Sequence, residues 1–164
     1  MKEPLHKALE FKSEIDLRRD AQGRWWCEGE EITHRGICAA FDAWLDRDED
    51  GRYFLKNAIS RVYVQIEGPP LFARGVEVRE GAMWAMLSDG TKEQVNLASL
   101  RQGEDGRLYF DAREGRMSCV FTDEAMAALS DWLGEDEEGV FLKIGETKAR
   151  WPVLKDPLDG QKAR

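Results

Sequence analysis

The chain has 164 residues, 42% of them hydrophobic and six of them Trp, which is enough apolar surface for an ordered globular protein. Its net charge of −8 makes it a poor candidate for coating DNA or RNA, because such binding depends on neutralising phosphates. No segment approaches the ~20 apolar residues that a membrane span needs, and no secretory signal is visible.

The cysteines indicate a protein from a reducing compartment. Cys27, Cys38 and Cys119 are odd in number and lack metal-ligand spacing, so reduced thiols are expected. We therefore predict a cytoplasmic protein.

The first half predicts a hairpin, a helix and a second pair of strands. Alternation and turn residues indicate strands over 14–19 and 24–28. Thr33 is placed to cap a helix. Apolar side chains then recur at helical spacing and form one stripe, made of Ile37, Phe41, Trp44 and Leu45. Strands are expected over 52–55 and 61–66, ending before Pro69, since proline cannot donate to a sheet.

The rest of the chain predicts three hairpins and a helix. The hairpins pair 71–78 with 82–87, 108–112 with 116–121, and 139–143 with 148–153. Thr122 is placed to cap the helix before the last hairpin. Residues 92–105 show no clear pattern and are expected to link the two halves.

Two stretches 88 residues apart share one pattern. Residues 39–56 and 127–143 coincide at ten positions when one gap is placed after the Gly of each turn. Each copy reads as a helix, an acidic turn and a strand. The fold expected is therefore α+β, with two duplicated helix and β-hairpin units and antiparallel sheets.

This pattern predicts a division of the chain into four parts. They are a first α+β unit at 14–70, a connecting hairpin and linker at 71–105, a second α+β unit at 106–155, and a disordered tail at 156–164.

The first acidic turn resembles the opening of a calcium loop. Its candidate ligands are Asp46, Asp48 and Asp50. An EF-hand needs a bidentate Glu at loop position 12, where this chain has Asn57. The second copy has Gly134 in place of Asp46, so the ligand set is not shared. The turn is interpreted as a solvated helix exit, and no metal is expected.

The candidate ligand-binding residues lie around the first hairpin. Trp25 and Trp26 must point to opposite faces of a strand, so one is free to stack on a planar ligand. Arg24 and Arg61 suit an anionic group, and His34 opens the first helix. No P-loop, dinucleotide fingerprint, zinc protease motif or nucleophile elbow is present, so we predict no enzyme and no cofactor.

The chain resembles the domain of unknown function 1285 (DUF1285) family of uncharacterised bacterial proteins. The resemblance is carried by Asp16-Leu17-Arg18, Gly23-Arg24-Trp25-Trp26, Glu28-Gly29 with Ile32, Asp50-Gly51-Arg52-Tyr53-Phe54-Leu55, and Val64-Gln65-Ile66-Glu67 with the prolines and Phe72 that follow. It implies a duplicated α+β protein whose second half is similar in outline to a pleckstrin-homology-type barrel. It also implies a ligand site between the halves and a signalling role linked to nucleotides or RNA processing.

These observations predict a non-enzymatic, regulatory protein that binds a small anionic or nucleotide-type ligand between its halves and acts in signal transduction. The predicted lining residues are Arg24, Trp25, Trp26, His34 and Arg61. One alternative is a protein–protein interaction module. Another is a metal-dependent hydrolase that uses the acidic turns. No membrane partner and no bulk nucleic-acid binding are expected.

Overall fold

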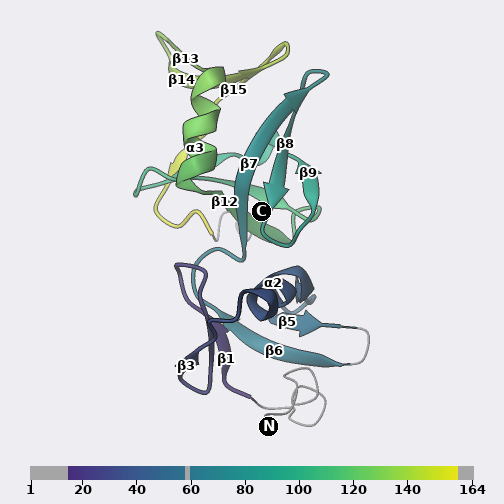
Figure 1. The fold of residues 1–164 in the computed structure, drawn as a ribbon. Helices are drawn as coiled ribbons and strands as arrows, with labels where there is room; N and C mark the ends of the chain where they lie inside the picture. The colour runs from purple at the N-terminus through teal and green to yellow at the C-terminus, as the bar shows by residue number, and fades with distance from the viewer. Residues whose placement is uncertain (1–14, 58–59, 159–164) are drawn as a thin grey trace. The chain divides into compact units, whose positions relative to one another are not determined.

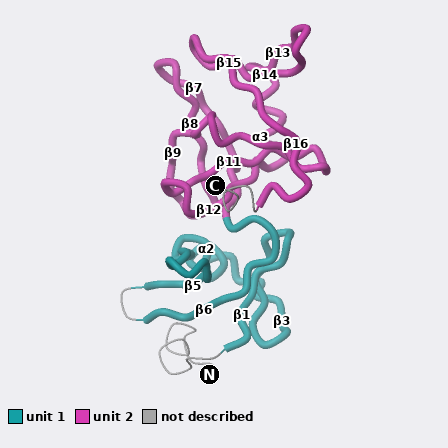
Figure 2. The backbone as a smooth tube through the Cα atoms, turned by 180° about the vertical axis from the view of Figure 1, so that it is seen from behind, with its two compact units in different colours: residues 1–70 teal, residues 71–164 magenta. Residues whose placement is uncertain are grey.

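The computed structural model describes residues 15–57 and 60–158. The chain divides into two compact units, residues 1–70 and residues 71–164, which are coloured separately in Figure 2. Both units combine helices with mixed sheets, so the predicted α+β class is confirmed.

In its described residues, unit 1 has a six-stranded sheet and one helix, α2 (Arg35–Trp44). The strands lie in the order β3-β2-β1-β6-β5-β4. Their bounds are Leu17–Arg19 (β1), Trp25–Cys27 (β2), Glu30–Glu31 (β3), Leu45–Arg47 (β4), Tyr53–Lys56 (β5) and Arg61–Ile66 (β6). The β1–β6 pairing is parallel and the other pairings are antiparallel.

Side-chain alternation gives the unit 1 sheet one buried face and one open face. On β6, Val62 and Val64 are buried, whereas Arg61, Tyr63 and Gln65 are exposed. Figure 1 shows α2 lying along the sheet beside β5 and β6. Among the described residues, the face that carries Tyr63 and Gln65 is therefore open and can form a binding surface.

A buried polar cluster stabilises the core of unit 1. Arg19 donates to the Asp42 carboxylate at 3.1 Å, and the Trp25 indole donates to the same carboxylate oxygen at 2.9 Å. Arg19 also donates to the backbone carbonyls of Pro69 and Pro70, at 2.8 and 2.6 Å. These hydrogen bonds offset the cost of burying the Arg19 guanidinium terminus, the Asp42 carboxylate and the Trp25 indole in an apolar core.

Unit 2 is built on a seven-stranded sheet in the order β16-β10-β11-β12-β7-β8-β9. The bounds are Leu71–Arg79 (β7), Ala82–Leu87 (β8), Lys92–Gln94 (β9), Arg101–Gly103 (β10), Leu108–Ala112 (β11), Met117–Phe121 (β12) and Val153–Leu154 (β16). Every residue of β11 and β12 is buried. Helix α3 (Asp123–Leu129) packs mainly against β7, as Figure 1 shows.

A separate three-stranded antiparallel sheet follows α3 in the chain. It consists of β13 (Leu133–Asp136), β14 (Gly139–Ile144) and β15 (Thr147–Ala149). The central strand β14 buries Leu142 and Ile144. This sheet is the part of unit 2 that corresponds to the second copy of the sequence pattern.

The two copies have equivalent strand registers. In unit 1, Leu45 pairs with Leu55 across β4 and β5. In unit 2, the corresponding Leu133 pairs with Leu142 across β13 and β14. Each copy thus contains a helix and then an antiparallel hairpin, with a 3₁₀ turn (Ser130–Trp132) between the two in the second copy. Descent of both from one ancestral unit stays a prediction, as does the pleckstrin-homology-type outline of the second half.

Several boundaries differ from the sequence predictions. Residues 92–105 are not a bare link, because they contain β9, a 3₁₀ turn (Leu97–Ser99) and β10 of the seven-stranded sheet. The hairpin predicted within 71–105 is present as β7 and β8, also in that sheet. The cap of α2 is His34 rather than Thr33. Thr122 caps α3 as predicted.

The C-terminal end also differs from expectation where it is described. Leu158 packs against Phe72, Tyr109 and Val120. The Arg101 guanidinium donates to the Pro157 carbonyl at 2.7 Å. Pro157 and Leu158 therefore make defined contacts although a disordered tail was predicted from residue 156, and residues 159–164 lie outside the described part of the chain.

Candidate functional site

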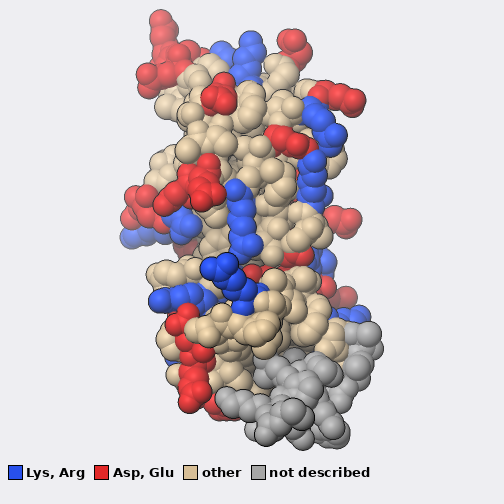
Figure 3. All heavy atoms as spheres, in the orientation of Figure 1, with Lys and Arg blue, Asp and Glu red and all other residues tan. Residues whose placement is uncertain are grey.

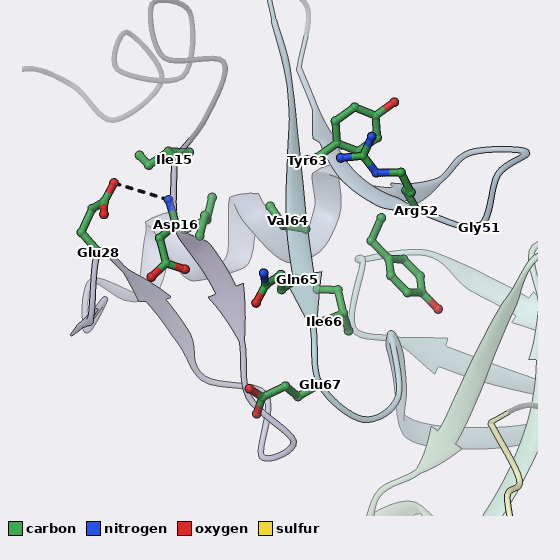
Figure 4. Close-up of a pocket in the computed structure, with 12 residues that line it drawn as sticks. Ile15, Asp16, Glu28, Gly51, Arg52, Tyr63, Val64, Gln65, Ile66 and Glu67 are labelled. Atoms are coloured by element: carbon green, nitrogen blue, oxygen red, sulfur yellow. Dashed lines mark hydrogen bonds between the residues drawn. The ribbon is translucent and has the colours of Figure 1, made fainter.

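A groove of about 1040 Å³ opens in unit 1. Strands β1, β5 and β6 contribute to it, together with the residues just before β1, just after β2 and just before β5. Figure 4 shows its walls. The lining residues are Ile15, Asp16, Leu17, Glu28, Gly51, Arg52, Tyr53, Tyr63, Val64, Gln65, Ile66 and Glu67. The groove is large enough for a small-molecule ligand.

A stacked pair, Arg52 and Tyr63, forms one end of the groove. The Arg52 guanidinium carbon lies 3.5 Å from the centre of the Tyr63 ring. Within the described part of the chain, Arg52 forms no ion pair. Stacking on an aromatic ring holds a guanidinium plane in place and leaves its N–H groups free to donate. Arg52 is therefore preorganised to bind a carboxylate or a phosphate.

The Asp48 carboxylate accepts hydrogen bonds from both Arg52 and Tyr63. One oxygen of its carboxylate accepts hydrogen bonds from the backbone N–H groups of Asp50 and Arg52, at 3.0 and 2.9 Å. The other oxygen accepts from the Tyr63 hydroxyl at 3.0 Å and lies 3.7 Å from Arg61. The hydrogen bond from the Arg52 backbone is the first cause that lowers the pKa of Asp48. The carboxylate is thus a positioning group for the turn and the ring.

Arg52 stands where the two sequence copies differ in length. Its turn runs from Asp48 to Arg52, closed by a hydrogen bond from the Asp48 N–H to the Arg52 carbonyl at 2.9 Å. In the second copy, Asp136 pairs directly with Gly139, so the corresponding turn is one residue shorter. The gap in the repeat is therefore the sequence signal that marks Arg52, a residue outside the predicted set of ligand-binding residues.

Unit 2 carries a related arrangement without a counterpart of Arg52. Asp136 occupies the position of Asp48, and Phe141 that of Phe54. Lys148 and Arg150 lie 4.4 and 5.2 Å from the centre of the Phe141 ring and both form ion pairs with Asp136. The cations of this arrangement are already neutralised by a carboxylate, so it is a weaker candidate for anion binding than Arg52.

Two of the predicted ligand-binding residues share one carboxylate. Asp20 accepts hydrogen bonds from the Trp26 indole at 2.9 Å and from the Arg24 guanidinium at 3.1 Å. Burial alone would raise the pKa of Asp20, but the hydrogen bonds from Trp26 and Arg24 outweigh it and lower the pKa. Neither Trp26 nor Arg24 lines the groove.

The other predicted residues lie elsewhere in unit 1. Trp25 is fully buried and packs edge-on against Phe41, so it has no surface to offer a ligand. His34 caps α2, where its Nδ1 accepts from the Ile37 N–H at 3.2 Å. The Arg61 guanidinium lies over the Phe54 ring at 3.8 Å, close to the stacked pair. The five predicted residues therefore do not form one site.

In the acidic turn, carboxylate oxygens of Asp46 and Asp48 accept hydrogen bonds from groups of the protein itself. The hydrogen bonds that Asp48 accepts occupy the carboxylate that a calcium loop would need. Asp46 accepts from the backbone N–H of Arg47 at 2.8 Å. In the described ranges 15–57 and 60–158, no group of three or more His, Cys, Asp and Glu side chains is arranged to hold a metal ion.

One face of the protein carries charged side chains of both signs. On the face drawn in Figure 3, basic and acidic side chains are interspersed among the described residues of both units. None of the helices in the described part of the chain has the length and apolar character needed to cross a membrane.

Comparison with known proteins gives a family. The DUF2944 family model, described as "Protein of unknown function (DUF2946)", matches residues 8–157. The chain belongs to this family. No curated protein matches the sequence.

Two solved structures are similar to this one. A DUF1285 family protein from Silicibacter pomeroyi DSS-3 has a TM-score of 0.65 and 17% identity, over 92% of this chain and 84% of its own. A DUF1285 family protein from Shewanella baltica OS155 has a TM-score of 0.57 and 20% identity, over 73% of this chain and 94% of its own. The resemblance to DUF1285 proteins predicted from the sequence is thus confirmed at the level of the fold.

Proposed function

We propose that the chain is a non-enzymatic ligand-binding protein whose unit 1 groove takes a small molecule with an anionic group. The observation that carries the proposal is the Arg52 guanidinium, stacked on Tyr63 at 3.5 Å and without an ion pair in the described part of the chain. Such a group loses little rotational freedom when it binds an anion, so it is suited to recognition.

Regulation rather than turnover is the role we assign to this binding. The described residues of the groove offer stacked and hydrogen-bonding groups, but no recognisable set of nucleophile, base and orienting group. This composition supports binding without turnover. A role in signal transduction follows the expectation from the DUF1285 resemblance. The sequence predicts a ligand between the two halves, whereas the groove belongs to unit 1 alone. A cytoplasmic location stays a prediction.

A binding screen tests the proposal. Nucleotides, phosphorylated metabolites and dicarboxylates are added to the full chain, and the unfolding temperature is measured. A ligand at 100 times its Kd stabilises the folded state by about 2.7 kcal/mol, which gives a clear shift. We expect at least one anion to shift the wild-type protein and not Arg52→Gln.

The matched control is Arg79→Gln, which removes an exposed Arg of unit 2 that pairs with Glu77. It should respond to the same anion as the wild type does. An anion that stabilises wild type and Arg52→Gln equally would place binding elsewhere and overturn the proposal.

A protein-interaction module is the second candidate, favoured by one observation in unit 2. Leu133 and Val140 lie on adjacent strands of the three-stranded sheet and are 40% and 47% exposed. Exposed apolar side chains close together are typical of contact surfaces. If this candidate is correct, Leu133→Ser with Val140→Ser abolishes capture of a partner and leaves the unfolding temperature of the protein unchanged.

A further inference from the structure

The unit 1 groove carries opposite charges at its two ends. Figure 4 shows Asp16 and Glu28 on one side, Arg52 with Tyr63 on the other, and Gln65 between them. Asp16 directly precedes β1, Glu28 directly follows β2, and Arg52 directly precedes β5. The ends therefore lie on different strands of one sheet, which fixes their separation.

Among the residues that the structure describes, the charges at both ends of the groove form no ion pair. In the described part of the chain, neither Asp16 nor Glu28 forms an ion pair, although Glu28 accepts a long hydrogen bond of 3.4 Å from the Asp16 N–H. Glu67 differs, because Arg18 lies 3.7 Å from its carboxylate. A groove with uncompensated opposite charges is complementary to a ligand that carries the same two charges in reverse order.

Strand spacing gives the length of that ligand. The order β2-β1-β6-β5 places three strand-to-strand steps between Glu28 and Arg52. At about 4.8 Å per step the separation is about 14 Å. An extended peptide rises about 3.5 Å per residue, so about four residues cover it.

The middle of the groove suits a peptide. The exposed side-chain amide of Gln65 both donates and accepts, as the groups of a peptide backbone require. Ile15 and Ile66 offer half-buried apolar surface for side chains. A nucleotide would place its phosphates near Arg52 but would leave the acidic end without a cation.

We propose that the groove binds a short zwitterionic peptide of about four residues. Its C-terminal carboxylate contacts Arg52, and its N-terminal ammonium group contacts Asp16 and Glu28. This inference rests on the proposed function, because it assigns a ligand class to the same groove. It adds that the ligand must carry a positive charge at the end opposite its anionic group. The proposed function alone does not require this.

Four forms of one peptide test the inference. The probe is Ala-Ser-Phe-Ala, used with both termini free, N-acetylated, C-amidated, or blocked at both ends. Each is titrated into the ¹⁵N-labelled full chain, and Kd is taken from amide shifts of residues in β1 and β6. A charge-assisted hydrogen bond is worth about 1.5–3 kcal/mol, so each block is expected to weaken binding about ten-fold or more.

Matched variants assign each end. In Arg52→Gln, C-amidation of the peptide should no longer weaken its binding, whereas N-acetylation should still do so. Asp16→Asn with Glu28→Gln should do the reverse. Glu30→Gln, an exposed carboxylate outside the lining of the groove, should behave as wild type.

The outcomes separate the inference from the proposed function. If amidation weakens binding and acetylation does not, the groove binds anions but the zwitterion inference is overturned. The same holds if only a nucleotide or another plain anion binds in a manner that requires Arg52. If no peptide form and no anion depends on Arg52, both proposals are overturned.

Discussion

The Arg19 guanidinium donates to the Asp42 carboxylate at 3.1 Å inside unit 1, where only 1% of the Arg19 side chain is exposed. Arg19 comes from β1 and Asp42 from α2, so the pair joins the sheet to the helix. Its hydrogen bonds to Pro69 and Pro70 also hold the end of the unit.

Removing one member of this pair should destabilise unit 1 strongly. Asp42→Ala leaves a buried guanidinium and the Trp25 indole without their acceptor, and we expect a loss of about 3–5 kcal/mol. Urea unfolding followed by circular dichroism measures it. Arg18→Ala is the control, because Arg18 forms an exposed ion pair with Glu67 that is worth ~0–1 kcal/mol. Equal effects of the two variants would contradict the prediction.

Asp48 should make the stability of unit 1 depend on pH. Its pKa is lowered from the ordinary 3.8, so its contribution is fully present above about pH 3.8 and is lost as pH falls through the lower folded value. The difference in unfolding temperature between wild type and Asp48→Asn should shrink over that range. Glu49→Gln, which changes an exposed carboxylate of the same turn, is the matched control. A difference that stays constant down to pH 2 would rule out this role for the carboxylate.

A side chain at position 134 should destabilise the protein as long as Phe141 is present. A Cβ at Gly134 would lie 2.6 Å from the Phe141 Cζ, because the ring covers the glycine on the neighbouring strand. Gly134→Ala should cost about 1–3 kcal/mol in thermal or chemical unfolding. The same change made in a Phe141→Leu background should cost much less. Equal costs in both backgrounds would show that the ring contact is not the cause.

The three cysteines should differ in reactivity. Cys119 is fully buried, and burial raises its pKa well above the ordinary 9.0, whereas Cys27 and Cys38 are half-buried. At pH 8 a thiol reagent should leave Cys119 unmodified in the native protein and modify it after denaturation. Cys119→Ala should therefore lower the thiol count of the denatured protein by one and leave the native count unchanged. A lower native count would show that Cys119 is accessible.

The sequence predicts the hairpins well, because the two strands and the turn of a hairpin lie in one short segment of the chain. Hairpin β7–β8 and hairpin β11–β12 begin and end within about two residues of their predicted bounds, because turn residues and alternation mark both. Strand β4 was missed, since Leu45 continues the apolar stripe of α2 although its backbone is extended. A buried position satisfies both patterns, so periodicity alone does not separate them.

The candidate site was less predictable than the fold. Trp25 and Trp26 were known to point to opposite faces, but which face is covered depends on where α2 packs. The stack of Arg52 on Tyr63 depends on a turn held by Asp48 and on the β5–β6 register. The gap in the repeat marks Arg52, but the ring on which it stacks is set by the pairing of β5 with β6, which composition and spacing do not encode.

The hydrogen bonds of Pro69 and Pro70 have a consequence for dissecting the protein. Their carbonyls are held by Arg19, and the next residue, Leu71, is the fully buried first residue of β7. The chain therefore passes from one unit to the other across a single peptide bond, without spare residues. A fragment ending before Pro69 would leave the Arg19 guanidinium short of acceptors, and one beginning after Leu71 would lose the start of a central strand. Only a cut between residues 70 and 71 gives each half its complete core.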